Sequence, residues 1–415
     1  MRRFLTVLLI LVALILLGTF WLGQTIEDDP RKVTWLPASV QQWPSVYLRI
    51  ALGYVRLMGV PQAAVDWPTV FDRAKAQAKG AKTTADTYPA IRTALEALGE
   101  GRGALLEPGV VTTGVSGAYG FYVLFPERIV AVVYPAGAAD KAGIKAGDLI
   151  ETVNGSAPVV SSDPRLRGQF ADIPKPHVRL SLRSPGAAAS REVSIDVASV
   201  PPLPAHTARL GSDIGYVELP GTTGDREFPL HVRASIAQTD AKETCGWIVD
   251  LRRNNGGALD GALVALRPFL GEGALGGGMI VDRRVPWSYP APRPDDPAFP
   301  PLMHPDPPVA VLMSRLTATA IAIAFRGRPN TRLFGEATWS LSGLRPAHNL
   351  PDGAQLNLVR EYGYDRSGHE YTGRFDPDEP VTIDWSKVLG SDADPVTIAA
   401  ASWLRQQPAC QKPGK

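Results

Sequence analysis

One short segment of the chain concentrates residues that could carry out chemistry. From Gly246 to Gly257 it reads Gly-Trp-Ile-Val-Asp-Leu-Arg-Arg-Asn-Asn-Gly-Gly. The apolar residues Trp247–Val249 suit a strand buried on both faces, and polar side chains crowd the place where that run ends. Gly256 and Gly257 allow a sharp turn whose N–H groups face a ligand. Because a helical pattern follows at 258–270, the segment predicts a strand, a glycine turn and a helix, an arrangement that can stabilise an oxyanion.

The same segment resembles the V-D-L-R-x-N-x-G-G motif of the tail-specific (C-terminal processing) serine peptidases. Further family motifs have counterparts in the expected order, namely Ile214-Gly215-Tyr216-Val217, Pro308-Val309-Ala310-Val311-Leu312, Phe334-Gly335-Glu336-Ala337-Thr338 and Leu350-Pro351-Asp352-Gly353-Ala354. The resemblance covers roughly residues 60 to 405. It implies an α/β (α+β) peptidase core of the ClpP/crotonase-like type and, by family, peptide-bond hydrolysis by a serine-type endopeptidase.

A second resemblance precedes that core. Residues 138–150 read Ala-Ala-Asp-Lys-Ala-Gly-Ile-Lys-Ala-Gly-Asp-Leu-Ile, which resembles the A-x-x-A-G-i-k-x-G-D-x-I segment of bacterial PDZ modules. In such modules a turn holds the C-terminal carboxylate of a peptide, which adds a strand to the sheet edge. The resemblance assigns this peptide-binding turn to Tyr119, Gly120, Phe121 and Tyr122. A generic β-rich spacer, or a module that only gates the neighbouring site, is the alternative.

The family resemblance also implies catalytic groups that this chain lacks. The usual machinery is a Ser nucleophile at the start of a helix with a Lys base, and a second branch, closer to tricorn-type enzymes, carries a His instead of the Lys. Where the nucleophile belongs, the chain reads Thr317-Ala318-Thr319 and is shorter than the family pattern, so the Ser position is deleted. Leu341 stands at the Lys position and Arg102 at the His position. We therefore expect hydrolysis to be impaired or absent.

Other hydroxyls near the deletion are the remaining candidates for a nucleophile. Thr317 and Thr319 are nearest, but a threonine inside a chain needs a base, and none is evident nearby in sequence. Ser314 is interpreted as structural, and Asp250 is expected to order the glycine turn. Three hypotheses stay open: an active peptidase, a non-catalytic peptide- or protein-binding pseudo-peptidase, and a membrane-tethered scaffold.

Composition excludes several other classes. The 415 residues carry a net charge of +2, and no basic cluster with interleaved aromatics occurs, so nucleic acid is not an expected partner. No His-x-x-x-His or Cys-x-x-Cys spacing and no phosphate-binding loop is present, so neither a metal nor a cofactor is expected. The expected partners are peptide or protein C-termini and a membrane. The oligomeric state stays open.

The N-terminus predicts a membrane anchor. Arg2 and Arg3 precede an uninterrupted apolar run at 4–22, which as a helix would span about 28 Å, close to a bilayer core. The arginines favour the cytoplasmic side, so the rest would lie in the periplasm or extracytoplasmic space. The run is longer than that of a usual signal peptide and lacks a small-x-small cleavage site, which favours an uncleaved, single-pass anchor in the inner (cytoplasmic) membrane. A cleaved signal peptide and a buried core helix are the alternatives.

The chain has only two cysteines, Cys245 and Cys410. An exported chain with an even number of cysteines can form a disulfide, and one between these two would tie down the C-terminal tail. Two buried free thiols are the alternative.

The predicted organisation has four regions. They are the membrane anchor at 1–23, a linker (24–45) with an N-terminal helical cap within 24–109, the PDZ-like module at 110–200 and the peptidase-like core at 205–405. Helices are predicted at 47–58, 67–78 and 88–98, the second of them capped by Asp66 and followed by an early proline. A dense run of prolines at 285–308 indicates an extended surface loop.

Overall fold

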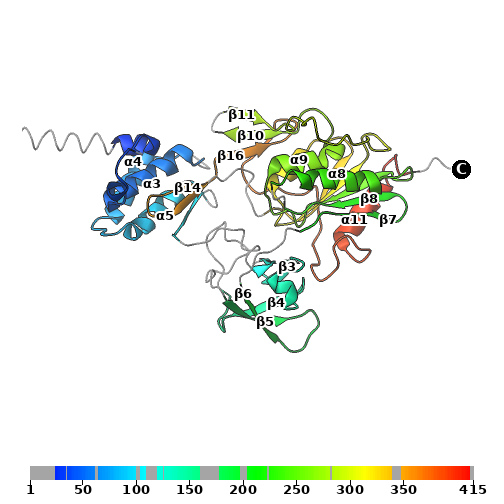
Figure 1. Cartoon of the computed structure of the whole chain (residues 1–415), viewed down its shortest axis with the longest axis horizontal. Helices are drawn as coiled ribbons and strands as arrows, with labels where there is room; N and C mark the ends of the chain where they lie inside the picture. The colour runs from blue at the N-terminus through cyan, green and yellow to red at the C-terminus, as the bar shows by residue number, and fades with distance from the viewer. Residues whose placement is uncertain are drawn as a thin grey trace, which may run out of the picture. The chain divides into compact units, whose positions relative to one another are not determined.

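The computed structural model describes residues 24–33, 35–60, 64–99, 103–108, 119–124, 126–158, 177–196, 203–221, 224–280, 283–338 and 347–411. The expected membrane anchor at 1–23 lies outside these residues. Within the described ranges, every helix is too short or too polar to cross a bilayer. The chain divides into two compact units: unit 1 comprises Met1–Val110 with Leu344–Glu361, and unit 2 comprises Val111–Gly343 with Tyr362–Lys415. Figure 1 colours the chain by residue number, from blue at the N-terminus to red at the C-terminus.

Unit 1 is built on the predicted helices. They are α3 (Pro44–Met58), α4 (Trp67–Gln77) and α5 (Tyr88–Glu96). The 3-10 turn η1 (Pro30–Val33) and the short α2 (Ala38–Gln41) precede α3, and the 3-10 turn η2 (Ala85–Thr87) lies between α4 and α5. The Asp66 carboxylate caps α4 by accepting from the Thr69 N–H at 3.4 Å, as expected for the residue before a helix, and it also accepts from the Thr69 hydroxyl at 2.7 Å. Apolar faces of the helices meet in one core that includes Leu52, Val55 and Ile91.

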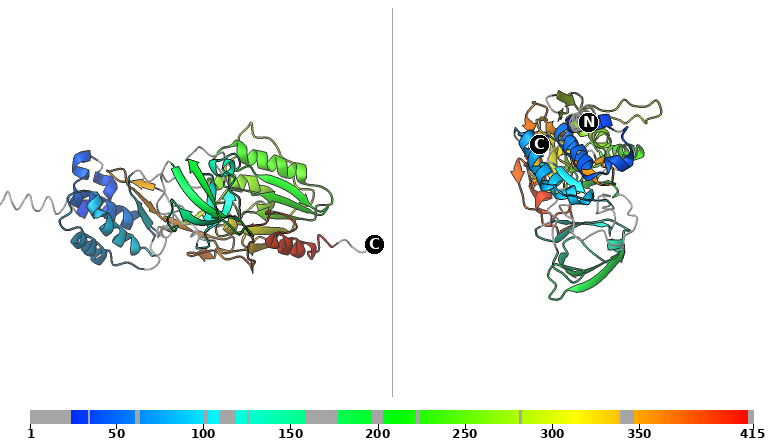
Figure 2. Two further views of the ribbon diagram at one scale, coloured as in Figure 1. Left: turned by 90° about the horizontal axis from the view of Figure 1, so that it is seen from below. Right: turned by 90° about the vertical axis from the view of Figure 1, so that its left-hand side faces the viewer.

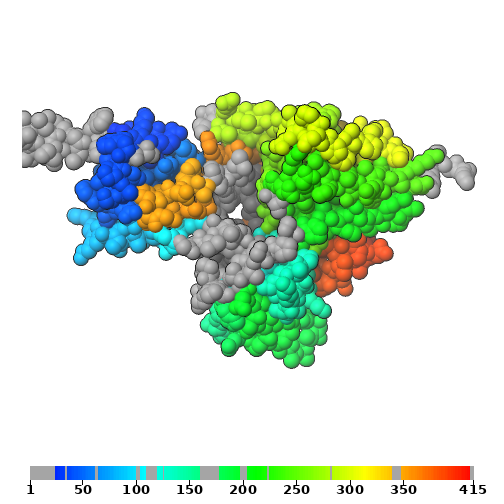
Figure 3. Space-filling model, viewed as in Figure 1, coloured from blue at the N-terminus to red at the C-terminus, as the bar shows by residue number. Residues whose placement is uncertain are grey.

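A segment expected in the peptidase-like core belongs to unit 1 instead. β14 (Ala347–Asn349) and β15 (Gln355–Leu358) form an antiparallel sheet with β1 (Gly103–Leu106). The turn between them is held by Asp352, whose carboxylate accepts from the Tyr47 hydroxyl at 2.8 Å and from the Tyr88 hydroxyl at 2.7 Å. In Figure 3 the orange atoms of this segment lie against the blue and cyan atoms of unit 1. The predicted core at 205–405 is therefore interrupted.

Unit 2 is organised around a six-stranded sheet. Its strand order is β18 (Glu379–Pro380), β13 (Thr331–Gly335), β12 (Val309–Met313), β9 (Gly246–Asp250), β8 (Ile214–Glu218) and β7 (His206–Leu210). All neighbours are parallel except β7, which runs antiparallel to β8. Every residue of β8, β9 and β12 is buried, as expected for strands that are covered on both faces.

Helices cover both faces of this sheet, as Figure 2 shows. The helices are α8 (Glu227–Thr239), α9 (Leu259–Leu270), α10 (Thr319–Phe325) and α11 (Pro395–Arg405). Val249 and Val311 point to a core shared with α8, α9 and α10. Their chain neighbours Ile248 and Ala310 point to the opposite core, shared with α11. A smaller sheet contains β11 (Arg283–Pro286), β10 (Gly277–Ile280), β16 (Glu361–Tyr364) and β17 (Glu370–Tyr371).

The predicted disulfide is present. Cys245, next to β9, is bonded to Cys410, which follows α11, and their Cα atoms are 4.9 Å apart. The bond joins the tail of the chain to the centre of the sheet.

A five-stranded antiparallel module occupies the region where a PDZ-like module is predicted. Its order is β2 (Phe121–Leu124), β3 (Ile129–Val133), β4 (Leu149–Val153), β5 (His177–Arg183) and β6 (Arg191–Asp196), with the short α7 (Ala138–Lys141). Val178, Leu180 and Leu182 are fully buried on one face of β5, which gives the module its own core. β2 is an edge strand of this sheet.

Candidate functional site

The chemistry-bearing segments meet at one edge of the six-stranded sheet. β9 and β12 are parallel neighbours, and Asp250 at the end of β9 pairs in register with Leu312. The glycine turn leaves β9 at this edge, and the shortened segment before α10 leaves β12 beside it. The Ala318 N–H donates to the Asn254 carbonyl oxygen at 2.7 Å, which joins the two loops directly. Ligands of parallel sheets usually bind at this edge.

The glycine turn has the backbone shape predicted for it. Gly256 and Gly257 have φ values of 115° and 106°, a region that L side chains rarely adopt. A Cβ atom on Gly256 would have no neighbour within 4 Å, so the space beside it is open. However, the Gly256 N–H already donates to the Asn254 side-chain oxygen at 3.2 Å. The exposed Gly257 is the other predicted oxyanion donor.

Asn254 builds this turn, a role that sequence reasoning missed. Its side chain is fully buried, and its amide nitrogen donates to the Pro220 carbonyl oxygen at 2.9 Å. The same side chain accepts from Gly256, so it links the loop after β8 to the turn after β9. The family motif contains this asparagine, but the acceptor of its amide nitrogen lies on the distant loop after β8 and cannot be read from the motif.

A buried ionic network lies behind the turn. Arg252 is 0% exposed, and its Nη2 atom lies 2.6 Å from an oxygen of Asp250 and 2.6 Å from one of Asp394. Burial alone would raise the pKa of Asp394, but the hydrogen bond and charge of Arg252 hold that pKa below its usual range. Tyr216 also donates to Asp250, at 2.8 Å. As expected, Asp250 orders the turn: it accepts from the Arg252 N–H at 2.9 Å.

Ser314 and Thr317 occupy the region where the nucleophile belongs, and both hydroxyls are bonded to backbone. The Thr317 hydroxyl donates to the Leu251 carbonyl oxygen at 2.9 Å and accepts from the Ser314 N–H at 2.8 Å. The Ser314 hydroxyl donates to the Arg252 carbonyl oxygen at 2.6 Å. Both side chains are 0% exposed. Within the described part of the chain, neither hydroxyl contacts a His, a Lys or a carboxylate.

Thr319 lies two residues further on, at the start of α10. Its hydroxyl is hydrogen-bonded to that of Thr338 at 3.0 Å, and the Thr338 hydroxyl also accepts from the Phe375 N–H at 3.2 Å. Thr319 is 2% exposed. The hydroxyls of Thr317 and Thr319 thus bond to different groups, a backbone carbonyl oxygen and the Thr338 hydroxyl. Leu341 and Arg102, which stand at the two expected base positions, lie outside the described residues.

The predicted peptide-binding turn is brought to the same region. Tyr119 and Phe121 are buried in the module core, and Gly120 between them has a φ of 81°. The Tyr122 hydroxyl accepts from the side-chain amide of Asn255, the residue before Gly256. This contact joins β2 to the glycine turn. It was not predicted, because it depends on where the module packs.

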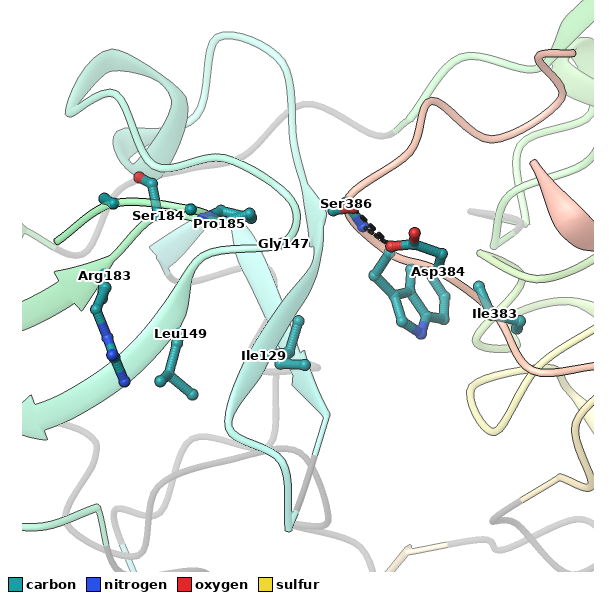
Figure 4. Close-up of a pocket in the computed structure, with 12 residues that line it drawn as sticks. Ile129, Gly147, Leu149, Arg183, Ser184, Pro185, Ile383, Asp384 and Ser386 are labelled. Carbon is teal, nitrogen blue, oxygen red and sulfur yellow. Dashed lines mark hydrogen bonds between the residues drawn. The ribbon is translucent and has the colours of Figure 1, made fainter. Parts of the chain in front are cut away.

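Two further contacts join the module to the core. Arg315, directly after Ser314, pairs with Glu127 of the module at 2.9 Å and with Glu336 of the core at 2.9 Å. The second contact is shown in Figure 4, where Gly147 of the module faces Ser386 of the core. A Cβ atom on Gly147 would lie only 3.1 Å from the Ser386 Cα atom. A cavity of about 420 Å³ lies beside this contact, and none of its lining residues belongs to the glycine turn.

No cluster suited to a metal ion is found in the described ranges, where three or more His, Cys, Asp or Glu side chains nowhere converge for one. The site that the described residues form consists of backbone donors, buried hydroxyls and a structural ion network.

Known proteins share this sequence pattern and fold. The family model "Peptidase family S41" matches residues 213–381, which contain the glycine turn and the segment before α10. The chain is 25% identical over 358 residues to carboxyl-terminal-processing peptidase 2, chloroplastic, of Arabidopsis thaliana, covering 78% of this chain and 66% of that protein, just under two thirds. It is 26% identical to the chloroplastic C-terminal processing peptidase of Tetradesmus obliquus, covering 75% of this chain and 73% of that one.

Solved structures agree on the fold. The photosystem II D1 C-terminal processing protease superposes with a TM-score of 0.58 at 21% identity, covering 88% of this chain and 98% of that one. Mature CPAF gives a TM-score of 0.51 at 13% identity, covering 86% and 95%. At these identities the likeness concerns the fold alone. The family model and the two processing peptidases confirm the resemblance seen in the motifs, and the chain carries a peptidase family S41 domain at residues 213–381.

Proposed function

We propose that this protein is a non-hydrolysing member of its family that binds peptide or protein C-termini. The observation that carries the proposal is the bonding of the Thr317 and Ser314 hydroxyls, which donate to the carbonyl oxygens of Leu251 and Arg252. A nucleophile must transfer its proton to a base as it attacks, and a backbone carbonyl oxygen is far too weak a base for that step. Full burial also keeps both oxygen atoms from a substrate.

The five-stranded module is the proposed binding element, acting as a PDZ module. An incoming peptide would add a strand along β2, which is an edge of the module sheet. Its C-terminal carboxylate would meet the turn at Tyr119–Tyr122, where the positive φ of Gly120 re-aims the backbone. The side chains of Tyr119 and Phe121 are buried, so they would support the turn rather than contact the peptide.

The proposed location is the outer side of the cytoplasmic membrane. The apolar run at 4–22 and the arginines before it support an anchor of this orientation. The disulfide between Cys245 and Cys410 supports an oxidising compartment, because such bonds persist in exported proteins and are rare in the cytosol.

Active serine-type hydrolysis is the second candidate. It is favoured by the family membership and by the open space beside Gly256, where an oxyanion would fit. Hydrolysis would require another hydroxyl to become accessible with a base beside it.

Peptide binding tests the proposal. A fluorescent peptide with an apolar C-terminus is titrated with the full chain, and the same peptide amidated at its C-terminus is the matched control. We expect saturable binding of the free acid, weaker binding of the amide, and recovery of the bound peptide intact. Equal affinity for acid and amide would contradict carboxylate recognition, and recovery of a shortened peptide would contradict the loss of hydrolysis.

A further inference from the structure

The segment that follows the apolar run is folded against unit 1, although a linker was expected there. Residues 24–28 are helical, and Ile26 within them is only 1% exposed. The segment crosses α3 at Gly53, where a Cβ atom would lie 2.6 Å from the Ile26 carbonyl oxygen. Only glycine leaves room for this approach. The segment is thus part of the folded unit rather than a flexible tether.

Ion pairs hold the same segment to two helices. The Glu27 carboxylate, whose side chain is 12% exposed, pairs with Arg49 of α3 and with Lys75 of α4, the latter at 2.7 Å. Asp28 pairs with Arg56 of α3, also at 2.7 Å. A carboxylate shared by two cations on different helices fixes the direction of the segment better than a single exposed pair would.

The docked segment begins almost directly after the apolar run, and this limits how far unit 1 can lie from the end of that run. Only Gly23 separates Leu22, the last residue of the apolar run, from Gln24. Two residues span at most about 7 Å. If the run crosses the bilayer, the docked segment holds unit 1 within a few ångströms of the lipid headgroups.

We propose that unit 1 is seated on the membrane, with Trp35 and Trp43 inserted among the lipid headgroups. This inference rests on the proposed membrane anchor. The two indoles are 69% and 60% exposed and flank the short α2, whereas the neighbouring Leu36 is buried. Tryptophan is enriched at membrane–water interfaces because its ring is apolar and its N–H is polar. The exposed cation Lys32 precedes Trp35 and suits the phosphate groups of lipids, whereas the neighbouring Arg31 is paired with Asp29 at 2.8 Å.

Depth-dependent quenching tests the seating. The full chain is reconstituted in phosphatidylcholine vesicles with and without acyl chains brominated near the headgroup, and tryptophan fluorescence is compared. Trp21 lies within the apolar run, so the difference between wild type and Trp21→Phe reports the anchor itself. In the Trp21→Phe background, the further changes Trp35→Phe and Trp43→Phe report the seating.

A matched control removes a tryptophan that lipid cannot reach. Trp385 is 5% exposed, and its indole N–H has no hydrogen-bond partner among the described residues, so Trp385→Phe removes no such bond. We expect the Trp35 and Trp43 changes to abolish most of the quenching left after Trp21→Phe, and Trp385→Phe to leave it unchanged.

The outcomes separate the two proposals. Quenching of Trp21 without quenching of Trp35 and Trp43 would overturn the seating and leave the anchor standing. No quenching of Trp21 would overturn the anchor.

A charge reversal tests the docked segment: Glu27→Lys should reduce quenching of Trp35 and Trp43 but not of Trp21. Asp72→Lys, the same change at an exposed position of α4, is the control, and equal effects of the two changes would contradict the role of Glu27.

Discussion

The Thr317 hydroxyl donates a hydrogen bond to the Leu251 carbonyl oxygen, and the two oxygen atoms are 2.9 Å apart. Through this bond the loop after β12 is joined to the loop after β9. The family resemblance implies a serine nucleophile near this position. In this chain the hydroxyl holds two strand-end loops together, so its removal is expected to affect stability rather than catalysis.

Replacing Thr317 tests that structural role. Thr317→Val keeps the shape of the side chain but leaves the Ser314 N–H without its acceptor. It also removes one of two donors to the Leu251 carbonyl oxygen, which still accepts from the Asn254 N–H at 2.9 Å. We expect a loss of roughly 1–3 kcal/mol in the free energy of unfolding, the usual cost of a buried group left unpaired. Thr317→Ser, which retains the hydroxyl, should lose less. Denaturant titrations measure both, and a valine variant as stable as wild type would disagree with the assigned role.

Reduction of the disulfide should destabilise unit 2. Cys245 and Cys410 are 165 positions apart, so the bond removes much freedom from the unfolded chain. We expect a loss of about 2–5 kcal/mol on reduction, as for other native disulfides. The comparison is the melting temperature with and without dithiothreitol. A Cys245→Ala/Cys410→Ala variant is the control and should not respond to the reductant; a response there would point to another cause.

The Asp352 carboxylate predicts a loss of stability in acid. Burial raises its pKa, but hydrogen bonds from Tyr88, the Ala354 N–H and Tyr47 outweigh burial and lower the pKa below its usual value. A lowered pKa in the folded state contributes stability above the usual pKa of Asp, and this contribution is lost as the pH falls through the folded value. The loss is therefore expected below about pH 4.

Asp352→Asn separates this group from the other carboxylates. The variant should be less stable than wild type at pH 7, and the difference should shrink as the pH falls below 4. Urea titrations at several pH values measure it. If the difference in free energy of unfolding between wild type and the variant stays constant across that range, the Asp352 carboxylate does not titrate as predicted.

Arg252 should be among the most sensitive positions in the core. Arg252→Met leaves the carboxylates of Asp250 and Asp394 buried without their cation, which we expect to cost about 3–5 kcal/mol. Arg332→Met is the control, because its pair with Glu379 is exposed and should contribute at most about 1 kcal/mol. Chemical unfolding measures the free energy of unfolding of both variants. Equal losses would contradict the prediction that the buried pairs of Arg252 contribute more than an exposed pair.

Much of the fold could be predicted from local signals. Prolines and the Asp66 cap marked the helices of unit 1, and the apolar run at 247–249 marked the central strand. The role of residues 24–28 could not be predicted, because Glu27 finds its partners on helices far along the chain. The same reason applies to 347–358, whose pairing with β1 links distant segments.

The site was predictable in its backbone but not in its side-chain bonds. Two adjacent glycines indicated the turn, and the motif indicated that Asp250 orders it. The contact between Tyr122 and Asn255 depends on the packing of the module against the core, which no local pattern encodes. The sequence also indicated Thr317 as a candidate nucleophile. It could not show that the Thr317 hydroxyl donates its hydrogen bond to a backbone carbonyl oxygen.

Direct measurement of hydrolysis tests the central claim. The full chain is incubated with an unstructured protein that ends in an apolar tail, and intact masses are followed over time together with labelling by a fluorophosphonate probe. The account predicts unchanged masses and no adduct on the chain. Shortened products that form with wild type and are absent with Thr317→Ala or Thr319→Ala, or a probe adduct on either threonine, would contradict it.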